Sequence, residues 1–115
     1  YNQRWYMDKA WKAFERSVAK VVSGERIPVA DRRTPLDIDH PLLGIECKYR
    51  NKISKFLKDA MWQAVSGSGE DKVPVVVLGE KHGREMLVLM RLEDLLDILG
   101  EAVKEEDIFN YGGTD

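Results

Sequence analysis

The sequence contains one cysteine, Cys47, so it cannot form a disulfide within a single chain. This excludes the disulfide-stapled scaffolds of secreted proteins and favours a reducing, cytoplasmic compartment. No apolar run approaches the ~20 residues of a membrane-spanning helix, and low-complexity segments and internal repeats are absent. The chain begins at Tyr1 instead of Met, so we expect Tyr1 to mark a truncation or processing point.

The chain also lacks a net excess of positive charge, since its formal net charge is -2. The charge is unevenly distributed, however. Residues 1–60 carry 13 Lys and Arg against 8 Asp and Glu, or +5, whereas residues 61–115 carry 5 against 12, or -7. This asymmetry is compatible with a basic face that attracts phosphates, and equally with two ordinary solvated surfaces.

With 115 residues the chain has the length of one domain, and we expect a single domain over residues 1–109 with a flexible Gly-rich tail at 110–115. Apolar residues recur at three- and four-residue spacing over residues 3–22, which predicts an amphipathic helix. Further predicted elements are strands at 26–30, 36–39 and 44–49, a helix at 55–65 after a Ser54 N-cap, strands at 73–79 and 86–90, and a helix from Leu92. This order predicts an α/β fold in which helices flank a mixed central sheet. The continuous apolar run 73–79 is typical of a strand covered on both faces.

Residues 35–49 form the most unusual stretch, because short apolar runs there carry Asp37, Glu46 and Lys48. Side chains alternate between the two faces of a strand, so Glu46 and Lys48 share a face while Cys47 points to the core. A turn centred between Pro41 and Leu42 places Asp37 opposite Glu46. The sequence therefore predicts a hairpin that brings two carboxylates and an amine together.

Such a group can hold a divalent metal ion. Mg²⁺ binds oxygen ligands at ~2.0–2.1 Å and retains several waters, so Asp37, Glu46 and the backbone carbonyl of Cys47 suffice. The metal would lower the pKa of a bound water and stabilise charge on a phosphoryl oxygen. Lys48 could orient that water or neutralise the developing charge. These are the requirements of phosphodiester hydrolysis.

The pattern of Asp37 followed by Glu46-Cys47-Lys48 resembles the PD-(D/E)XK nuclease motif, and residues 10–90 most resemble the Holliday junction resolvase-like branch of archaea and phages. The resemblance implies a restriction-endonuclease-like αβββαβ core with a C-terminal strand and helix. It implies DNA cleavage with Mg²⁺ or Mn²⁺, a homodimer, a microbial or phage-encoded protein, and neither a membrane nor a small-molecule cofactor. Asp37 and Glu46 then become metal ligands and Lys48 the catalytic lysine. Glu15 matches a further acid on the first helix, and Gln63 matches a polar residue on the helix after the motif.

The sequence departs from the family pattern at two points. Pro35-Leu36-Asp37 replaces the usual Pro-Asp, so Asp39, on the same face, is an alternative ligand to Asp37. Position 67 is Gly where one subfamily has a Tyr four residues after the Gln, which disfavours that subfamily.

Basic residues surround the motif and could contact DNA phosphates, although each could equally belong to a solvated surface. They are Arg32, Arg33, Arg50, Lys52, Lys55 and Lys58, with Lys52, Lys55 and Lys58 expected along the next helix. The favoured function is a Mg²⁺-dependent DNA endonuclease acting on branched, four-way junctions. The alternatives are a restriction- or repair-type nuclease of the same superfamily, or a non-catalytic DNA-binding or assembly module with this fold.

Overall fold

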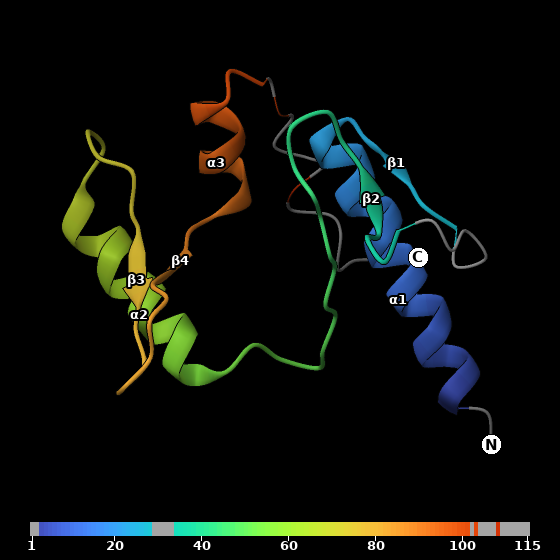
Figure 1. The fold of residues 1–115 in the computed structure, drawn as a ribbon, viewed down its shortest axis with the longest axis horizontal. Helices are drawn as coiled ribbons and strands as arrows, with labels where there is room; N and C mark the ends of the chain where they lie inside the picture. The colour runs from blue at the N-terminus through green and yellow to red at the C-terminus, as the bar shows by residue number, and fades with distance from the viewer. Residues whose placement is uncertain (1–2, 29–33, 102, 104–107, 109–115) are drawn as a thin grey trace. The chain divides into compact units, whose positions relative to one another are not determined.

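The computed structural model describes residues 3–28, 34–101, 103 and 108, with side chains described from residue 9 onward. It is a mixed α/β structure with three helices and two small antiparallel sheets within these residues (Figure 1). The chain divides into two compact units, a first unit of residues 1–49 and 101–115 and a second unit of residues 50–100. No described helix is long and apolar enough to cross a bilayer.

In the first unit, helix α1 (Gln3–Val22) coincides with the helix predicted from the apolar spacing. Its inner face buries Ala19, Val21 and Val22 against strands β1 (Glu25–Arg26) and β2 (Ile38–Asp39). The two strands pair antiparallel, with Arg26 opposite Ile38. Gly24 makes the close approach possible, because a Cβ at this position would collide with the carbonyl oxygen of Asp39.

The three strands predicted for the first unit are present only as short remnants. Strand β1 begins one residue earlier than predicted and ends before Pro28, whose missing N–H cannot extend a ladder. Residues 29–33 lie outside the described part of the chain. The predicted strand 44–49 is reduced to one antiparallel bridge between Ile45 and Ile38. This bridge nevertheless has the predicted register, in which Asp37 stands opposite Glu46.

The second unit begins with an extended segment that leads to helix α2 (Lys55–Ser68). The predicted N-cap is confirmed, since the Ser54 hydroxyl accepts a hydrogen bond from the Leu57 N–H at 3.3 Å. The helix runs three residues further than predicted and ends before Gly69, which has a φ of 66°. Lys52 precedes this helix instead of lying on it.

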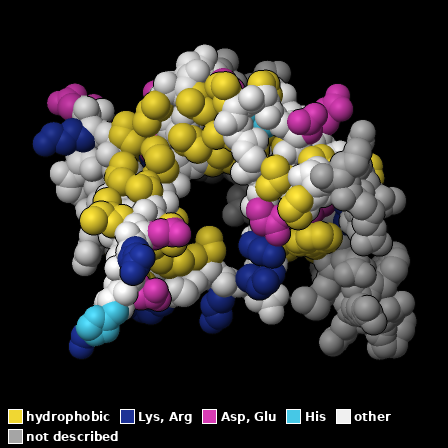
Figure 2. All heavy atoms as spheres, in the orientation of Figure 1, with side chains coloured by type: hydrophobic (Ala, Val, Ile, Leu, Met, Phe, Trp, Pro, Cys, Tyr) yellow, Lys and Arg dark blue, Asp and Glu magenta, His cyan; other side chains and the backbone are white. Residues whose placement is uncertain are grey.

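Strands β3 (Val76–Leu78) and β4 (Leu87–Leu89) form a separate antiparallel hairpin, followed by helix α3 (Leu92–Ile98). One mixed sheet was predicted, whereas the described residues form two separate sheets. The prediction that residues 73–79 are covered on both faces is wrong. Val77 and its partner Val88 are both 59% exposed, because α2 packs against β3 while the face carrying these two valines stays open. Hydrophobic side chains are visible over this part of the chain in Figure 2.

Candidate active site

Glu15 is the one charged side chain among the described residues that is fully buried, with 1% of its surface exposed. The sequence motif includes Glu15 as a further acid on the first helix, and the structure places this side chain inside the core of the first unit. Its Oε1 accepts a hydrogen bond from Nε of Arg26 at 2.6 Å. Among the described residues, no group donates a hydrogen bond to Oε2. A buried carboxylate oxygen without a donor is costly, and Oε2 is the one buried side-chain oxygen or nitrogen without a partner among the described residues.

Asp37 lies next to Glu15. Burial raises the pKa of the Glu15 carboxyl, the hydrogen bond from Arg26 lowers it, and the charge of Asp37 raises it again. Two adjacent carboxylates can be hydrogen-bonded to each other only when one of them holds a proton, and a bound cation can take the place of that proton. The carboxyl groups of Glu15 and Asp37 are therefore close enough for the charge of one to act on the other.

The Asp37 carboxylate also organises the hairpin. Its Oδ2 accepts the N–H of Cys47 at 2.6 Å. The Asp37 N–H in turn donates to the carbonyl of Ile45 at 2.9 Å. The Asp37 side chain thus accepts the Cys47 N–H, which in a longer strand pair would donate to a backbone carbonyl. This explains why no regular strand follows Ile45. The same bond fixes Asp37 against the acid-x-lysine segment.

Cys47 lies among three acids and is buried, as its alternation with Glu46 and Lys48 predicts. Burial raises the pKa of its thiol to about 11, with further contributions from Asp37, Glu15 and Glu46. The thiol is therefore neutral near pH 7, and it contributes to the site as a small apolar group. The charges of all three carboxylates oppose the ionisation of this one thiol.

Glu46 and Lys48 extend from the same face of the hairpin, as predicted, and they pair with each other. The Lys48 Nζ lies 3.0 Å from Oε2 of Glu46, with the side chains 67% and 47% exposed. In the described part of the chain, no three His, Cys, Asp or Glu side chains are grouped closely enough to hold a metal ion. Glu15 is buried, Asp37 is half-buried and Glu46 is exposed.

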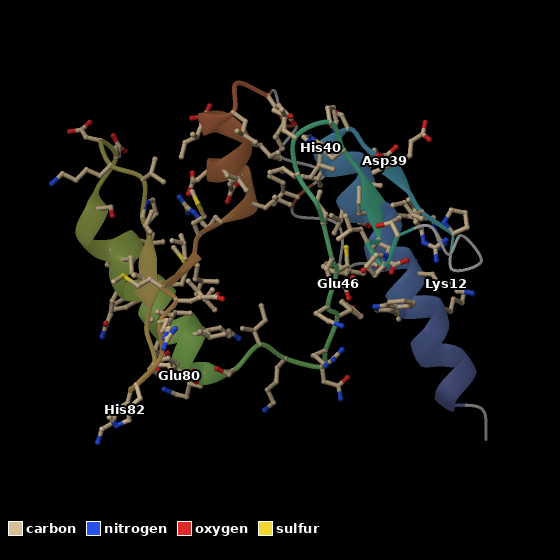
Figure 3. All side chains as sticks on the ribbon, in the orientation of Figure 1. Lys12, Asp39, His40, Glu46, Glu80 and His82 are labelled. Atoms are coloured by element: carbon tan, nitrogen blue, oxygen red, sulfur yellow. The ribbon has the colours of Figure 1, made fainter. Side chains whose placement is uncertain are left out.

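Asp39, the alternative to Asp37, is exposed on β2, where its backbone pairs with Glu25. Figure 3 shows Asp39 and His40 near one end of the hairpin and Glu46 further along its second arm. Asp37, and not Asp39, acts on the Glu15 carboxyl. The described geometry therefore gives Asp37 the position beside Glu15.

The remaining predicted residues lie outside this cluster. Arg32 and Arg33 are outside the described residues. Arg50, Lys52, Lys55, Lys58 and Gln63 all belong to the second unit and are exposed. Lys55 forms an ion pair with Asp59 one turn along α2, at 2.6 Å. Gln63 lies on the exposed part of α2.

Two residues of the first unit were not predicted from the sequence. Arg26 is the partner of the buried Glu15, and the position of this acid among the apolar residues of the first helix is the signal that could have prompted a search for a nearby cation. His40 organises the turn, because its Nδ1 accepts the N–H groups of Leu42 and Leu43 at 3.0 and 3.1 Å. Its Nε2 lies 2.9 Å from Oε1 of Glu101. Because Nδ1 accepts these two hydrogen bonds, Nε2 is the protonated ring nitrogen, and it donates a hydrogen bond to Oε1 of Glu101. The signal for His40 is its place at the start of a Pro-containing turn.

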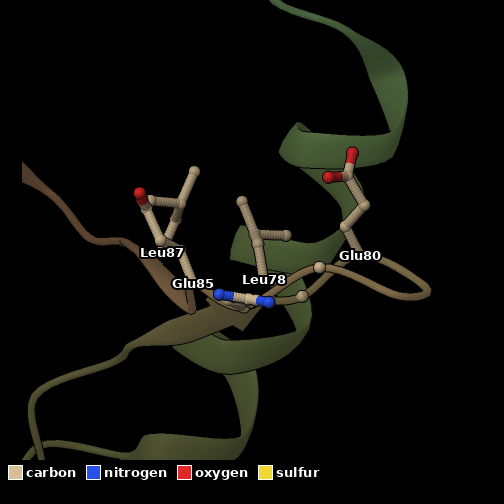
Figure 4. A pocket seen from close by; sticks show the side chains of 7 residues that line it. Leu78, Glu80, Glu85 and Leu87 are labelled. Atoms are coloured by element: carbon tan, nitrogen blue, oxygen red, sulfur yellow. The ribbon is translucent and has the colours of Figure 1, made fainter.

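A hollow of about 420 Å³ opens beside the β3–β4 hairpin (Figure 4). It is lined by Leu78, Gly79, Glu80, Gly83, Arg84, Glu85 and Leu87. None of the residues predicted for catalysis or metal binding lines it, so it provides no support for the candidate site.

The cluster of Glu15, Asp37, Glu46 and Lys48 is therefore the candidate active site on geometric and electrostatic grounds. Comparison of the chain with family models, with curated proteins and with solved structures gives no match.

Proposed function

We propose that the protein is a metal-dependent DNA endonuclease whose active site is the cluster of Glu15, Asp37, Glu46 and Lys48. The observation that carries the proposal is the buried Oε2 of Glu15, which has no donor in the described structure, in a carboxyl group on which the charge of Asp37 acts. A divalent cation would interact with Oε2 of Glu15 and with a carboxylate oxygen of Asp37 at the same time. The restriction-endonuclease-like core implied by the motif and the reducing cytoplasmic setting are part of this proposal.

In this proposal Glu15, Asp37 and Glu46 hold Mg²⁺ or Mn²⁺, with the carbonyl of Cys47 as a further oxygen ligand. The bound metal would supply an activated water and stabilise charge on the scissile phosphate. Asp37 has one oxygen occupied by the Cys47 N–H, so its other oxygen is the one available to a metal. The Cys47 N–H thereby fixes the orientation of this carboxylate.

Lys48 is assigned the role of the catalytic amine. Its ion pair with Glu46 is largely exposed, and pairs of this kind contribute only about 0–1 kcal/mol. Each partner can therefore be recruited at little cost, Glu46 by a metal ion and the Lys48 ammonium by a phosphate oxygen. The ammonium would orient the attacking water or neutralise charge as the phosphodiester bond breaks.

The substrate in this proposal is DNA, with four-way junctions as the favoured form and a homodimer as the active assembly. Arg50, Lys52, Lys55 and Lys58 follow the motif directly and supply exposed positive charge for phosphate contacts. Arg32 and Arg33 extend this basic set in sequence. A restriction- or repair-type nuclease would use the same chemistry on linear duplex.

One observation favours a second candidate, a non-catalytic DNA-binding or assembly module. Glu46 is paired with Lys48, and no three potential ligands are grouped in the described residues. Such a module would keep the buried Glu15–Arg26 pair as a structural element and bind DNA without cutting it.

A paired cleavage assay decides between these candidates. Purified full chain is incubated with a four-way junction and with linear duplex of the same sequence, with Mg²⁺ or Mn²⁺ and with a chelator as control. The nuclease proposal predicts metal-dependent cutting, faster on the junction. Binding without cutting of either DNA would support the module, and cutting of duplex alone would support the restriction- or repair-type enzyme.

A further inference from the structure

The two carboxylate oxygens of Glu15 have different environments. Oε1 is held by Nε of Arg26 at 2.6 Å, whereas Oε2 is buried and receives no hydrogen bond from any described group. The Arg26 side chain is 22% exposed and that of Glu15 only 1%. A charge-assisted hydrogen bond in such a shielded place is both short and strong, so it restricts how the carboxylate can rotate.

The two partners come from different elements, which makes their separation a property of the fold. Glu15 lies on α1, and Arg26 lies on β1, where it pairs with Ile38 of β2. Ile38 also forms the antiparallel bridge to Ile45 on the other arm of the same hairpin. Arg26 is thus attached to the same sheet as Ile38, the residue that follows Asp37, and it fixes Glu15 relative to this segment.

We propose that Arg26 is the positioning residue of the site: it occupies Oε1 of Glu15 and leaves Oε2, to which no described group donates, as the single Glu15 oxygen offered to a divalent cation. This inference rests on the proposed metal-dependent function. It assigns a role to a residue that the motif does not contain. It also implies that Glu15 binds the cation through one oxygen.

Simple electrostatics makes the opposite prediction for a positive side chain near a cation site. A guanidinium repels a divalent cation, so its removal should strengthen metal binding if only charge mattered. If Arg26 instead holds the carboxylate in place, its removal should weaken binding. The sign of the effect therefore separates positioning from net charge.

The test is Mn²⁺ binding by the full chain, measured by electron paramagnetic resonance of free Mn²⁺ at constant pH and salt, without DNA. Arg26→Met should bind Mn²⁺ at least ~10-fold more weakly, the size of effect usual for residues that orient metal ligands. Arg16→Met is the matched control, because Arg16 follows Glu15 on α1 but is exposed. It removes the same charge and should leave the affinity unchanged or slightly higher.

Arg26→Lys provides the decisive variant, because it keeps the charge and avoids leaving a buried acid wholly unpaired. A lysine ammonium is a point charge on a flexible stem and does not reproduce the planar guanidinium, so Mn²⁺ binding should still weaken. In a Glu15→Gln background the Arg26→Lys change should have no further effect, since Arg26 acts through Glu15. Thermal melting of every variant establishes that it is folded.

The outcomes separate the inference from the function on which it rests. If the unaltered chain binds no Mn²⁺ and cuts no DNA, the proposed function is overturned, and the role of Arg26 with it. If the unaltered chain binds Mn²⁺ and folded Arg26→Lys binds it equally well, only the positioning role is overturned. An equal effect of Arg26→Lys in the Glu15→Gln background would also overturn it.

Discussion

The two hairpins of this protein differ in how deeply their side chains are buried. Neither the regularity of the strand pairing nor the apolar content of the strands would suggest this difference. The hairpin of the first unit has a single bridge after β2, yet it buries Ile38, Cys47 and, on α1, the charged Glu15. The β3–β4 hairpin has three consecutive residue pairs and a richer apolar sequence, yet Val77 and Val88 are more than half exposed. Strand pairing follows local β-propensity, whereas burial depends on which element covers the face. The less regular hairpin is the one that carries the candidate chemistry.

The largest expected effect concerns catalysis and compares one lysine from each unit. Lys48→Met should reduce DNA cleavage by roughly 10³-fold or more, because it removes a charge that acts on the developing transition state. Lys58→Met, on exposed α2, should leave the cleavage rate within a few fold and reduce only the salt dependence of binding. Single-turnover cleavage and a binding assay in Ca²⁺ measure the two effects. Equal losses for both lysines would contradict the assignment of Lys48.

The second prediction compares the cores of the two hairpins. Ile38→Ala should lower the free energy of unfolding by roughly 2–4 kcal/mol, because Ile38 is fully buried and lies between β1 and Ile45. Val77→Ala should lower it by less than about 0.5 kcal/mol, since its side chain is mostly in solvent. Urea titration followed by circular dichroism provides both values. A large loss for Val77→Ala would show that this face is covered in solution.

The third prediction concerns Cys47 at alkaline pH. The folded thiol has a pKa of about 11 against an ordinary value of 9.0, so the unfolded chain loses its proton first as the pH rises. The favourable contribution of the neutral thiol is complete below pH 9 and is lost between pH 9 and 11. The difference corresponds to roughly 2–3 kcal/mol. Cys47→Ala should flatten this part of the stability profile, and a disulfide reagent at pH 8 should react with Cys47 only after unfolding.

The smallest effect concerns Glu15. Its folded pKa is raised, so its contribution to stability is complete below the ordinary value of 4.5 and is lost as the pH rises through the folded pKa. Glu15→Gln removes this titration, so the free energy of unfolding of the variant should fall less between pH 4 and pH 8 than that of the unaltered chain, and the variant should bind Mn²⁺ more weakly. Unfolding of both proteins at pH 4 and pH 8 measures the difference. A Gln variant whose free energy of unfolding falls as much between the two pH values as that of the unaltered chain would contradict it.

Much of the first unit could be predicted from the sequence because the determining signals are local. The apolar spacing of residues 3–22 defines α1, and the position of Pro41 and Leu42 in the turn gives the register of Asp37 and Glu46. The alternation along residues 46–48 correctly predicts that Cys47 is buried. Each of these depends on residues close together in the chain.

The features that escaped prediction depend on tertiary contacts. The Glu15–Arg26 bond joins a helix to a strand, and nothing in either segment alone indicates its partner. The bond from Cys47 N–H to Asp37 Oδ2 replaces a ladder hydrogen bond with a side chain, so the predicted strand 44–49 is shortened. The apolar run at 73–79 was expected to be covered, but an apolar sequence cannot specify what packs against it.

The bond between His40 and Glu101 has a consequence for the order of folding. The two residues are 61 positions apart, with the whole second unit between them, and the His40 side chain is 1% exposed. During synthesis, α1 and the candidate-site hairpin leave the ribosome well before Glu101 does. The imidazole proton of His40 therefore has no protein acceptor at Glu101 until residues 50–100 have been made. The turn beside the candidate site is completed only after the second unit has been translated, which makes this contact a late step of folding.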